Sequence, residues 1–410
     1  ALNILCLIII LLLSGVYLYV SNYANATTEF FKNMFQDLVE TEEYYVIVKK
    51  DSNYNVIEDI DKEVIYAFQI EDDVKKDIES KVSITFETDN SLTYLGKKLI
   101  DDKLNVILIS SSQYDILAEE IQDFKSDTKI IYTSKHEIQK SDTLNTQDSK
   151  FTIENEIFNV YITGIDAEGG INKVARSDAN IIATVNTKTN EILLTSIPRD
   201  YYVTLHSKNE KDKLTHSGLY GVDETIGTVE DLLDIDINYY IRVNFTTVMN
   251  LIDILGGVDV YSEYEFTSSS IGYKYEKGYN YLNGREALWF SRERYAFEDG
   301  DNQRIKNQQA VIEAIINKVI NSTALLTKYT DILETLQTSL QTNIGQEEIS
   351  DLVKLQVQNK PIWKIKNNTL TGTGEYMPTY SIGTLKSYVI IPDEKSIENA
   401  KEKINELIEE

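Results

Sequence analysis

The chain has 410 residues, of which 66 are acidic and 40 are basic, so its formal net charge is -26. Because a surface of this sign repels phosphate backbones, the charge excludes a nucleic-acid-binding protein. The single cysteine excludes a disulfide framework and a cysteine-based zinc site. With 42% hydrophobic residues and only four prolines, the composition is that of a folded protein, and the length suggests two or three domains.

The N-terminal segment is the most apolar part of the chain. Residues 4–20 carry no charge, and a helix of this length rises about 26 Å, close to the roughly 30 Å hydrocarbon core of a bilayer. A secretory signal peptide is the alternative, because Ala24-Asn25-Ala26 resembles a cleavage site, but the apolar part of a signal is usually only about 7–15 residues long. We therefore predict a transmembrane helix at residues 1–20 that anchors the protein in a membrane.

The next segments predict a stalk and a small domain. Apolar residues at spacings of three and four predict an amphipathic stalk helix over residues 21–43. Between residues 44 and 150, short β-rich runs alternate with predicted helices, which indicates an accessory α/β domain that ends in a polar linker. The predicted strands are residues 45–48, 82–86, 106–110 and 129–132, the predicted helices are 64–70 and 112–124, and the linker is 140–150.

Residues 151–410 form a second unit. Its sequence alternates strongly β-rich runs with helical periodicity, which predicts an α/β fold with a mixed central β-sheet flanked by helices on both faces. The predicted strands are residues 157–165, 179–186, 191–197, 240–244 and 388–391, and the predicted helices are 221–233, 246–255, 302–320 and a segment after Pro392.

Arginine is confined to one region of the chain. Only seven of the 40 basic residues are arginines, and all seven lie between residues 176 and 304. Arginine binds carboxylate or phosphate through two parallel hydrogen bonds, which lysine cannot do. We interpret Arg242 and Arg285 as surface ion pairs with the abundant carboxylates. The candidate anion ligands are Arg176, Arg199, Arg292, Arg294 and Arg304.

A predicted hairpin brings acidic and basic side chains together. If residues 187–190 form its turn, Asn186 faces Glu191, and the same register places Asp178 opposite Arg199. We therefore expect both ends of the hairpin to meet at one end of the sheet.

The residues next to this pair suggest a metal site. Arg176 and Asp200 flank it, and Asp166 joins the group if the strand before it lies beside the hairpin. Two or three carboxylates with arginines between them suit Mg²⁺ that bridges phosphate oxygens, because this ion takes few protein ligands. Clustered surface carboxylates are the alternative in so acidic a chain.

Two further segments carry candidate phosphate ligands. An extended segment would place Arg292 and Arg294 on the same side. Asp301 is predicted to be the N-cap of the following helix, on which Arg304 and Gln308 share a face.

The same helix continues with Ile312, Ile315 and Val319, which predict either core packing or a groove for a lipid tail. A loop at residues 213–218 contains Lys213, a candidate anion ligand, and His216, which we interpret as structural because a lone histidine more often is.

Taken together, these motifs resemble the LytR-CpsA-Psr family in type and order across residues 151–340. The motifs are Asp166, Arg176-Ser177-Asp178, Ile197-Pro198-Arg199-Asp200, Lys213-Leu214-Thr215-His216, Asp253-Ile254-Leu255-Gly256-Gly257-Val258-Asp259-Val260, Leu282-Asn283-Gly284, Arg292-Glu293-Arg294 and Asp301-Asn302-Gln303-Arg304. The membrane segment and the accessory domain resemble the streptococcal capsule-type members in particular.

The resemblance implies a Mg²⁺-dependent phosphotransferase on the outer face of a Gram-positive cell membrane. It would move a glycopolymer, such as a capsular polysaccharide, from an undecaprenyl diphosphate carrier to peptidoglycan. By position, the metal ligands would be Asp166 and Asp178, the catalytic residues Arg176, Arg199 and Asp301, and the phosphate- or lipid-binding residues Arg176, Arg199, Arg292, Arg294, Arg304, Gln308 and Lys213.

Two alternatives stay open, namely a polyprenyl-diphosphate hydrolase and a non-catalytic envelope protein that binds prenyl-phosphate lipids. The residues also leave open which of four aspartates is the base: Asp166, Asp178, Asp200 or Asp301.

Overall fold

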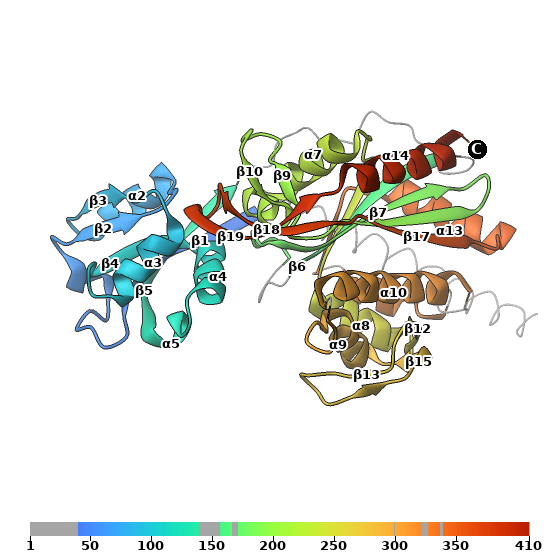
Figure 1. The fold of residues 1–410 in the computed structure, drawn as a ribbon, viewed down its shortest axis with the longest axis horizontal. Coiled ribbons are helices and arrows are strands. Elements are labelled where there is room, and N and C mark those ends of the chain that lie inside the picture. Colours follow the sequence, from blue (N-terminus) through green and yellow to red (C-terminus); the bar gives the residue numbers. More distant parts are fainter. Residues whose placement is uncertain are drawn as a thin grey trace, which may run out of the picture.

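Two α/β bodies lie next to each other in the computed structural model, which describes residues 40–138, 156–165, 171–298, 300–321, 327–336 and 339–409 (Figure 1). The predicted transmembrane helix, the predicted linker and Asp166 lie outside these ranges. Within them, every helix is too short or too polar to cross a bilayer.

The first body is the predicted accessory α/β domain. Its five-stranded sheet has the order β3-β2-β4-β1-β5, in which β2 is parallel to β3 and β4, and β1 is antiparallel to β4 and β5. The elements are β1 (Glu40–Lys49), η1 (Ile57–Ile60), β2 (Val64–Ala67), α2 (Asp72–Glu79), β3 (Thr85–Thr88), α3 (Leu92–Ile100), β4 (Val106–Ser110), α4 (Ser111–Glu120), α5 (Phe124–Asp127) and β5 (Thr128–Ile138).

The predicted stalk helix is wrong at its C-terminal end. Strand β1 begins at Glu40 and pairs with β5 from there on, so the predicted boundary at residue 43 falls inside a strand. Glu40 and Glu42 are buried on alternate positions of this strand. The carboxylate of Glu42 accepts hydrogen bonds from the hydroxyls of Ser112 and Tyr44. Ser112 is 70 residues away in the sequence, and a partner so distant is invisible to helical periodicity.

The helix predicted at residues 64–70 is also wrong, because Val64–Ala67 is strand β2. Ile65 and Ala67 are buried on alternate positions, and the strand lies between β3 and β4. A four-residue apolar run does not distinguish strand from helix, and pairing on both sides decides the outcome here.

The second body contains the predicted mixed sheet, with the strand order β16-β11-β6-β7-β8-β17. Strand β11 is parallel to β6, and the hairpin β7–β8 has the predicted register, with Asn186 opposite Glu191. The strands are β6 (Ile157–Ile165), β7 (Ser177–Asn186), β8 (Glu191–Ser196), β11 (Tyr239–Asn244), β16 (Leu340–Thr342) and β17 (Lys364–Thr369).

Helices cover both faces of this sheet, as predicted. Helices α7 (Val222–Leu233) and α14 (Glu394–Glu409) pack on one face, and α10 (Gly300–Asn321) and α13 (Gln346–Asn359) pack on the other (Figure 1). Side chains alternate between the two cores along each strand. On β7, for example, Ile182 belongs to the first core and Ile181 to the second.

Smaller elements surround the sheet. A lobe made of α8 (Phe245–Ile254), β12 (Val258–Ser262), β15 (Gly278–Leu282) and α9 (Gly284–Arg292) packs against α10. The remaining elements are β9 (Tyr202–Thr204), β10 (Lys211–Lys213), α6 (Leu214–Ser217), η4 (Gly218–Tyr220), β13 (Phe266–Thr267), β14 (Lys274–Tyr275), α12 (Tyr329–Leu336), β18 (Gly372–Thr379) and β19 (Gly383–Pro392).

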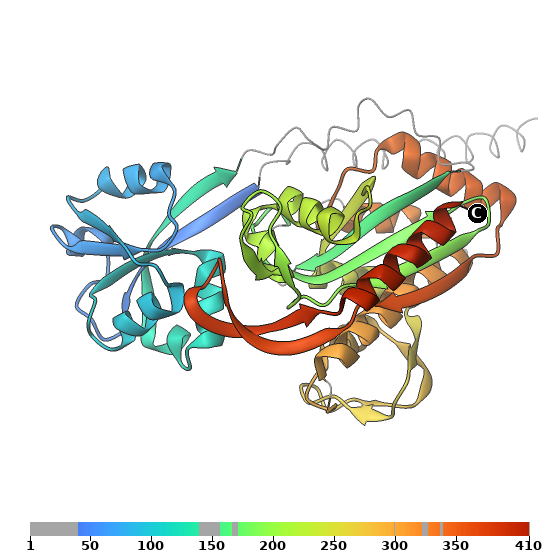
Figure 2. The ribbon, with the colours of Figure 1, turned by 45° about the horizontal axis from the view of Figure 1, so that its top comes forward.

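Within the described residues, backbone hydrogen bonds join the two bodies at two places. The turn of the β18–β19 hairpin reaches α3, where the Leu92 amide donates to the Ile382 carbonyl at 2.9 Å (Figure 2). The start of β1 lies on the segment that leads into β7, where the Thr41 amide donates to Asn172 and the Thr41 carbonyl accepts from Val174. Backbone bonds therefore tie the accessory domain to the chain just ahead of Arg176.

Arg242 strengthens this second contact and corrects one prediction. It pairs with a carboxylate, Glu40, as expected, but the pair is buried and joins the two bodies instead of lying on the surface. Its second terminal nitrogen, Nη2, donates to the Lys173 carbonyl at 2.8 Å.

Candidate functional site

The topology gathers the candidate residues at one end of the large sheet. Strands β6, β8, β11 and β17 end there, and β7 starts there, because Ile165 pairs with Ser177 and Asn244, and Thr369 pairs with Ser196. Segments that follow the carboxyl ends of neighbouring strands meet at a common edge, which is where open α/β sheets bind ligands.

Asp178 is the central carboxylate of this end. Its Oδ1 accepts hydrogen bonds from Arg199 Nη1 at 2.8 Å and from Thr215 Oγ1 at 3.1 Å. Burial favours the neutral carboxyl, but the charges of Arg199, Arg176 and Arg304 outweigh it and hold the pKa of Asp178 below its ordinary value. Asp178 is therefore an anion, and the predicted Asp178–Arg199 pair is confirmed.

Arg199 bridges two carboxylates. Besides Asp178, it approaches Asp200, with Nε 3.5 Å from Oδ2. Within the described residues this buried Nε makes no hydrogen bond, and the Asp200 carboxylate is the acceptor near it. Lys213 lies on the other side of Asp200, with Nζ 3.6 Å from Oδ1, which brings this predicted anion ligand to the same place.

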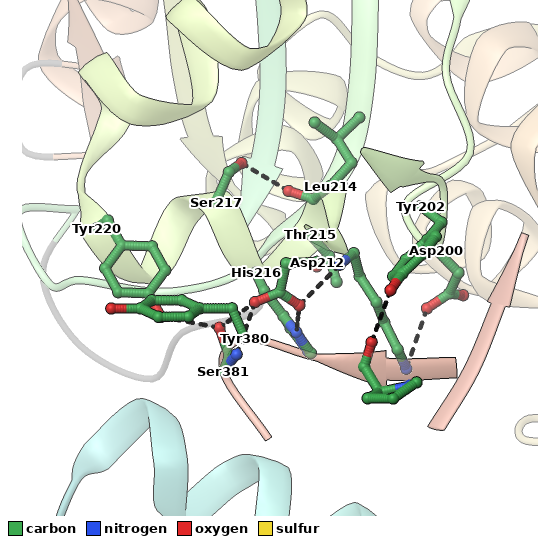
Figure 3. Close-up of polar contacts among 12 residues, drawn as sticks. Asp200, Tyr202, Asp212, Leu214, Thr215, His216, Ser217, Tyr220, Tyr380 and Ser381 are labelled. Atoms are coloured by element: carbon green, nitrogen blue, oxygen red, sulfur yellow. Dashed lines mark hydrogen bonds and ion pairs between the residues drawn. The ribbon is translucent and has the colours of Figure 1, made fainter. Parts of the chain in front are cut away.

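The segment around Lys213 is held by a buried network that includes His216 (Figure 3). The Asp212 carboxylate contacts His216 Nδ1 at 2.7 Å and accepts from the Ser381 hydroxyl at 2.5 Å and from the Ser381 amide at 2.8 Å. Tyr220 contacts the same serine hydroxyl at 2.9 Å. This network ties α6 to the β18–β19 turn, which agrees with the structural interpretation of the lone histidine.

Arg176 has a partner in the accessory domain. Its two terminal nitrogens donate to both oxygens of Glu119 on α4, with Nη1–Oε2 at 2.8 Å and Nη2–Oε1 at 2.7 Å. Only 14% of the Arg176 side chain is exposed.

Arg304 lies near the start of α10, and its charge is one of those that lower the pKa of Asp178. The helix is fixed beneath the sheet by Gln309, whose amide donates to the Leu194 carbonyl at 2.7 Å. Gln308 lies four residues after Arg304 on this continuous helix, as predicted. Asp301 is not the N-cap, because α10 already begins at Gly300 and places Asp301 in the first turn.

Arg292 and Arg294 differ from the prediction in backbone conformation, while Arg292 packs near the end of β6. Arg292 is the last residue of α9, so the two arginines do not alternate along an extended strand. The Arg292 guanidinium lies 5.3 Å from the Phe245 ring, and Phe245 borders Gly164 at the end of β6. A Cβ added to Gly164 would lie 3.2 Å from the Cβ of Ala179 on β7, so the glycine eases the close pairing of these two strands.

Glu293, between the two arginines, fixes the turn that separates them. Its buried carboxylate accepts hydrogen bonds from the amides of Ser269, Arg294, Tyr295 and Ala296. The Arg292-Glu293-Arg294 motif by itself does not predict this structural role of Glu293.

The aspartate carboxylates at the sheet end offer the oxygen ligands that a hard divalent cation prefers. Asp178 is ionised, and within the described chain its second oxygen accepts no hydrogen bond. The described residues contain no group of three acidic or histidine ligands that could hold a metal by itself. The second predicted ligand, Asp166, lies outside them, so the metal site stays a prediction.

Comparison with known proteins identifies the family. The sequence profile of the LytR_cpsA_psr family matches residues 120–406. The chain belongs to the LytR-CpsA-Psr family.

Individual members of the LytR-CpsA-Psr family match the same part of the chain. A Bacillus cereus protein named polyisoprenyl-teichoic acid–peptidoglycan teichoic acid transferase TagU is 36% identical over 214 residues, which is 52% of this chain and 68% of that protein. Its Bacillus subtilis counterpart is 37% identical over 219 residues, 53% of this chain and 69% of that protein. The crystal structure of B. subtilis TagV superimposes with a TM-score of 0.53 at 28% identity and covers 63% of this chain and 99% of TagV.

The family motifs account for most of the site, but two contacts lie outside what the motifs predicted. Thr215 belongs to the Lys213-Leu214-Thr215-His216 motif without an assigned role, yet its hydroxyl donates to Asp178. Glu119 had no sequence signal, because a glutamate on an amphipathic helix is ordinarily a surface residue. It was missed since its partner Arg176 is 57 residues away.

Proposed function

We propose that this chain transfers a glycopolymer from a polyprenyl diphosphate carrier to peptidoglycan, with capsular polysaccharide or teichoic acid as the polymer. The TagU relatives are named for the transfer of polyisoprenyl-linked teichoic acid to peptidoglycan. The observation that carries the proposal is the ion pair of Arg199 with the buried Asp178 at the sheet end, with Asp200 and Lys213 next to it.

The cationic groups bind the diphosphate. Each guanidinium donates in a planar, two-bond arrangement that matches phosphate oxygens. Arg199 contributes its guanidinium beside Asp178, and Lys213 adds a point charge next to Asp200. Arg292 and Arg294 extend the positive region on the side of α9 and α10.

The hydrocarbon chain lies along α10, between that helix and the sheet. Ile312 and Ile316 of α10 and Ile349 and Leu352 of α13 are only partly buried against the sheet. Ile315 packs instead against the α8–α9 lobe, which corrects its predicted place in the groove. Because α10 carries Arg304 in its first turns and the isoleucines beyond, its polarity runs from charged to apolar, as in a prenyl diphosphate.

The reaction is a phosphoryl transfer. A hydroxyl oxygen of the peptidoglycan acceptor attacks the phosphorus that carries the glycan. The new phosphorus–oxygen bond forms as the bridging bond of the diphosphate breaks, polyprenyl phosphate leaves with that electron pair, and the hydroxyl proton passes to a base. The arginines orient the diphosphate and stabilise its charge in the transition state.

Asp178 is better suited to holding cations than to accepting the proton. Its lowered pKa makes it a weak base, and one of its oxygens already accepts from Arg199 and Thr215. Among the described carboxylates, this leaves Asp200 as the candidate base beside Arg199. Bound Mg²⁺, held by Asp178 and Asp166, would neutralise phosphate charge at this place.

The apolar segment at residues 4–20 would anchor the protein in the cytoplasmic membrane, with the two α/β bodies on the outer face. This places the phosphate-binding arginines on the side where the carrier-linked polymer and peptidoglycan meet.

One assay separates the transferase from the two alternatives. The full chain, in detergent, is incubated with a glycan linked to a prenyl diphosphate and Mg²⁺, with and without a peptidoglycan fragment. A transferase yields glycan–peptidoglycan product and prenyl phosphate only when the acceptor is present. A hydrolase releases prenyl phosphate without acceptor. A lipid-binding protein binds the carrier and releases nothing, and either of the last two results would refute the proposed transfer.

A further inference from the structure

The bond between Arg176 and Glu119 links the accessory domain to the site. Glu119 lies near the end of α4 and takes both terminal nitrogens of Arg176 at 2.7 and 2.8 Å. This two-bond edge of a guanidinium is the one that also fits two oxygens of a phosphate. A carboxylate and a phosphate therefore cannot use it at the same time.

The two partners are not equally fixed. The Glu119 side chain is 55% exposed, whereas that of Arg176 is 14% exposed. The backbone before Arg176 is held by the bonds of Thr41 to Asn172 and Val174, and Lys173 forms an ion pair with Glu43 at 3.1 Å. When the pair separates, Glu119 is the partner that moves.

The surroundings give Glu119 room to leave. A cavity of about 560 Å³ lies between α4, β1 and residues 173–176, and both Glu119 and Arg176 line it. A carboxylate that turns into this cavity reaches water, so the release of Glu119 exchanges its bonds to Arg176 for bonds to solvent.

The positive charges of Arg176 and Arg199 also act on Glu119. Burial raises its pKa, but the hydrogen bonds and charge of Arg176 and the charge of Arg199 outweigh this and lower it. The side chain is thus an anion next to the cations that the proposed substrate needs.

We propose that Glu119 and one phosphate of the prenyl diphosphate compete for the same edge of Arg176, so that the accessory domain sets the substrate affinity of the catalytic domain. This inference rests on the proposed function, and it assigns to the accessory domain a direct part in substrate binding.

The test compares two variants of the full chain in detergent, Glu119→Gln and Asp115→Asn. Asp115 is a matched control, because it lies one turn earlier on α4, lines the same cavity, is 50% exposed and pairs with Lys125 instead of an arginine. Both variants remove one negative charge from the same helix. The probe is undecaprenyl diphosphate, with binding measured by calorimetry and folding checked by thermal unfolding.

Glu119→Gln is expected to bind the probe about two- to fivefold more tightly than the wild type, which corresponds to the strength of a partly exposed ion pair. Asp115→Asn is expected to bind it as the wild type does. A purely structural role for Glu119 predicts unchanged or weaker binding, and either result would overturn the inference, as would an equal gain in both variants. A wild-type protein that fails to bind the probe would instead refute the proposed function, and the inference with it.

Discussion

The two faces of the large sheet are covered to very different extents. Among the described residues, 18 hydrophobic side chains are buried and three are partly buried on the face beneath α7 and α14. On the face beneath α10 and α13, where Val353 and Val357 are not among the described side chains, eight are buried and nine are only partly buried. The first face is a closed core that holds the fold together, whereas the second retains apolar surface that a hydrocarbon chain can cover.

The difference supports our proposal that stability and substrate binding are separated within one sheet. The arginine cluster lies at the end of the sheet, where a ligand can reach both the charged residues and the half-covered face. Large exposed apolar surfaces are rare on soluble proteins and commonly mark a binding site, which is why we place the lipid tail there.

The largest effect is expected at the sheet end itself. Asp178→Asn keeps the shape of the side chain but removes its charge, so turnover should fall by about 100-fold or more, as when a preorganised charge-stabilising group is lost. EDTA treatment of the wild type should have a similar effect if Mg²⁺ is required. The transferase assay measures both, and full activity of the variant, or of EDTA-treated protein, would contradict the metal assignment.

On the closed face, Ile404→Ala should cost stability without affecting the ligand. Ile404 of α14 is fully buried, so truncation leaves a cavity that lowers the free energy of unfolding by about 2–5 kcal/mol. Chemical denaturation measures this change. The affinity of the folded variant for prenyl diphosphate should equal that of the wild type, and a weaker affinity would mean that the closed face also takes part in binding.

At the arginines, Arg199→Lys tests two-bond recognition as opposed to charge alone. Lysine keeps the charge but cannot bridge Asp178, Asp200 and a phosphate, so we expect turnover to fall by about 10- to 100-fold, or about 1.4–2.8 kcal/mol in activation free energy. Arg285→Lys is the control, because Arg285 is exposed on α9. Equal activity of both variants would show that Arg199 acts only as a positive charge.

The smallest effect is expected on the half-covered face. Ile312→Ala changes the same residue type as Ile404→Ala, but its site is only partly buried, so stability should fall by roughly 1 kcal/mol or less. Affinity for a long-chain prenyl diphosphate should weaken about fivefold, while affinity for inorganic pyrophosphate stays constant. An equal loss for both ligands would argue against a tail along α10.

Local patterns in the sequence predicted a large part of this protein. Alternating and helical periodicities gave the mixed sheet with helices on both faces, and the turn at residues 187–190 fixed the register that brings Asp178 to Arg199. These features depend on residues that are close in the sequence and on the side-chain periods of 2 residues in strands and 3.6 residues in helices. The sequence alone is therefore enough to predict them.

Other features depend on residues far apart in the chain, and only the tertiary structure decided them. Residues 64–67 became a strand because β3 and β4 lie on either side. Arg242 forms a buried ion pair with Glu40, which is 202 residues away in the sequence. Arg176 pairs with Glu119, which belongs to the other domain. Burial and ion pairing depend on which distant segments the fold brings into contact, and the periodicity of the sequence does not predict those contacts. For the same reason the sequence could assign apolar residues to both faces of the sheet, but only the packing determined which face is closed.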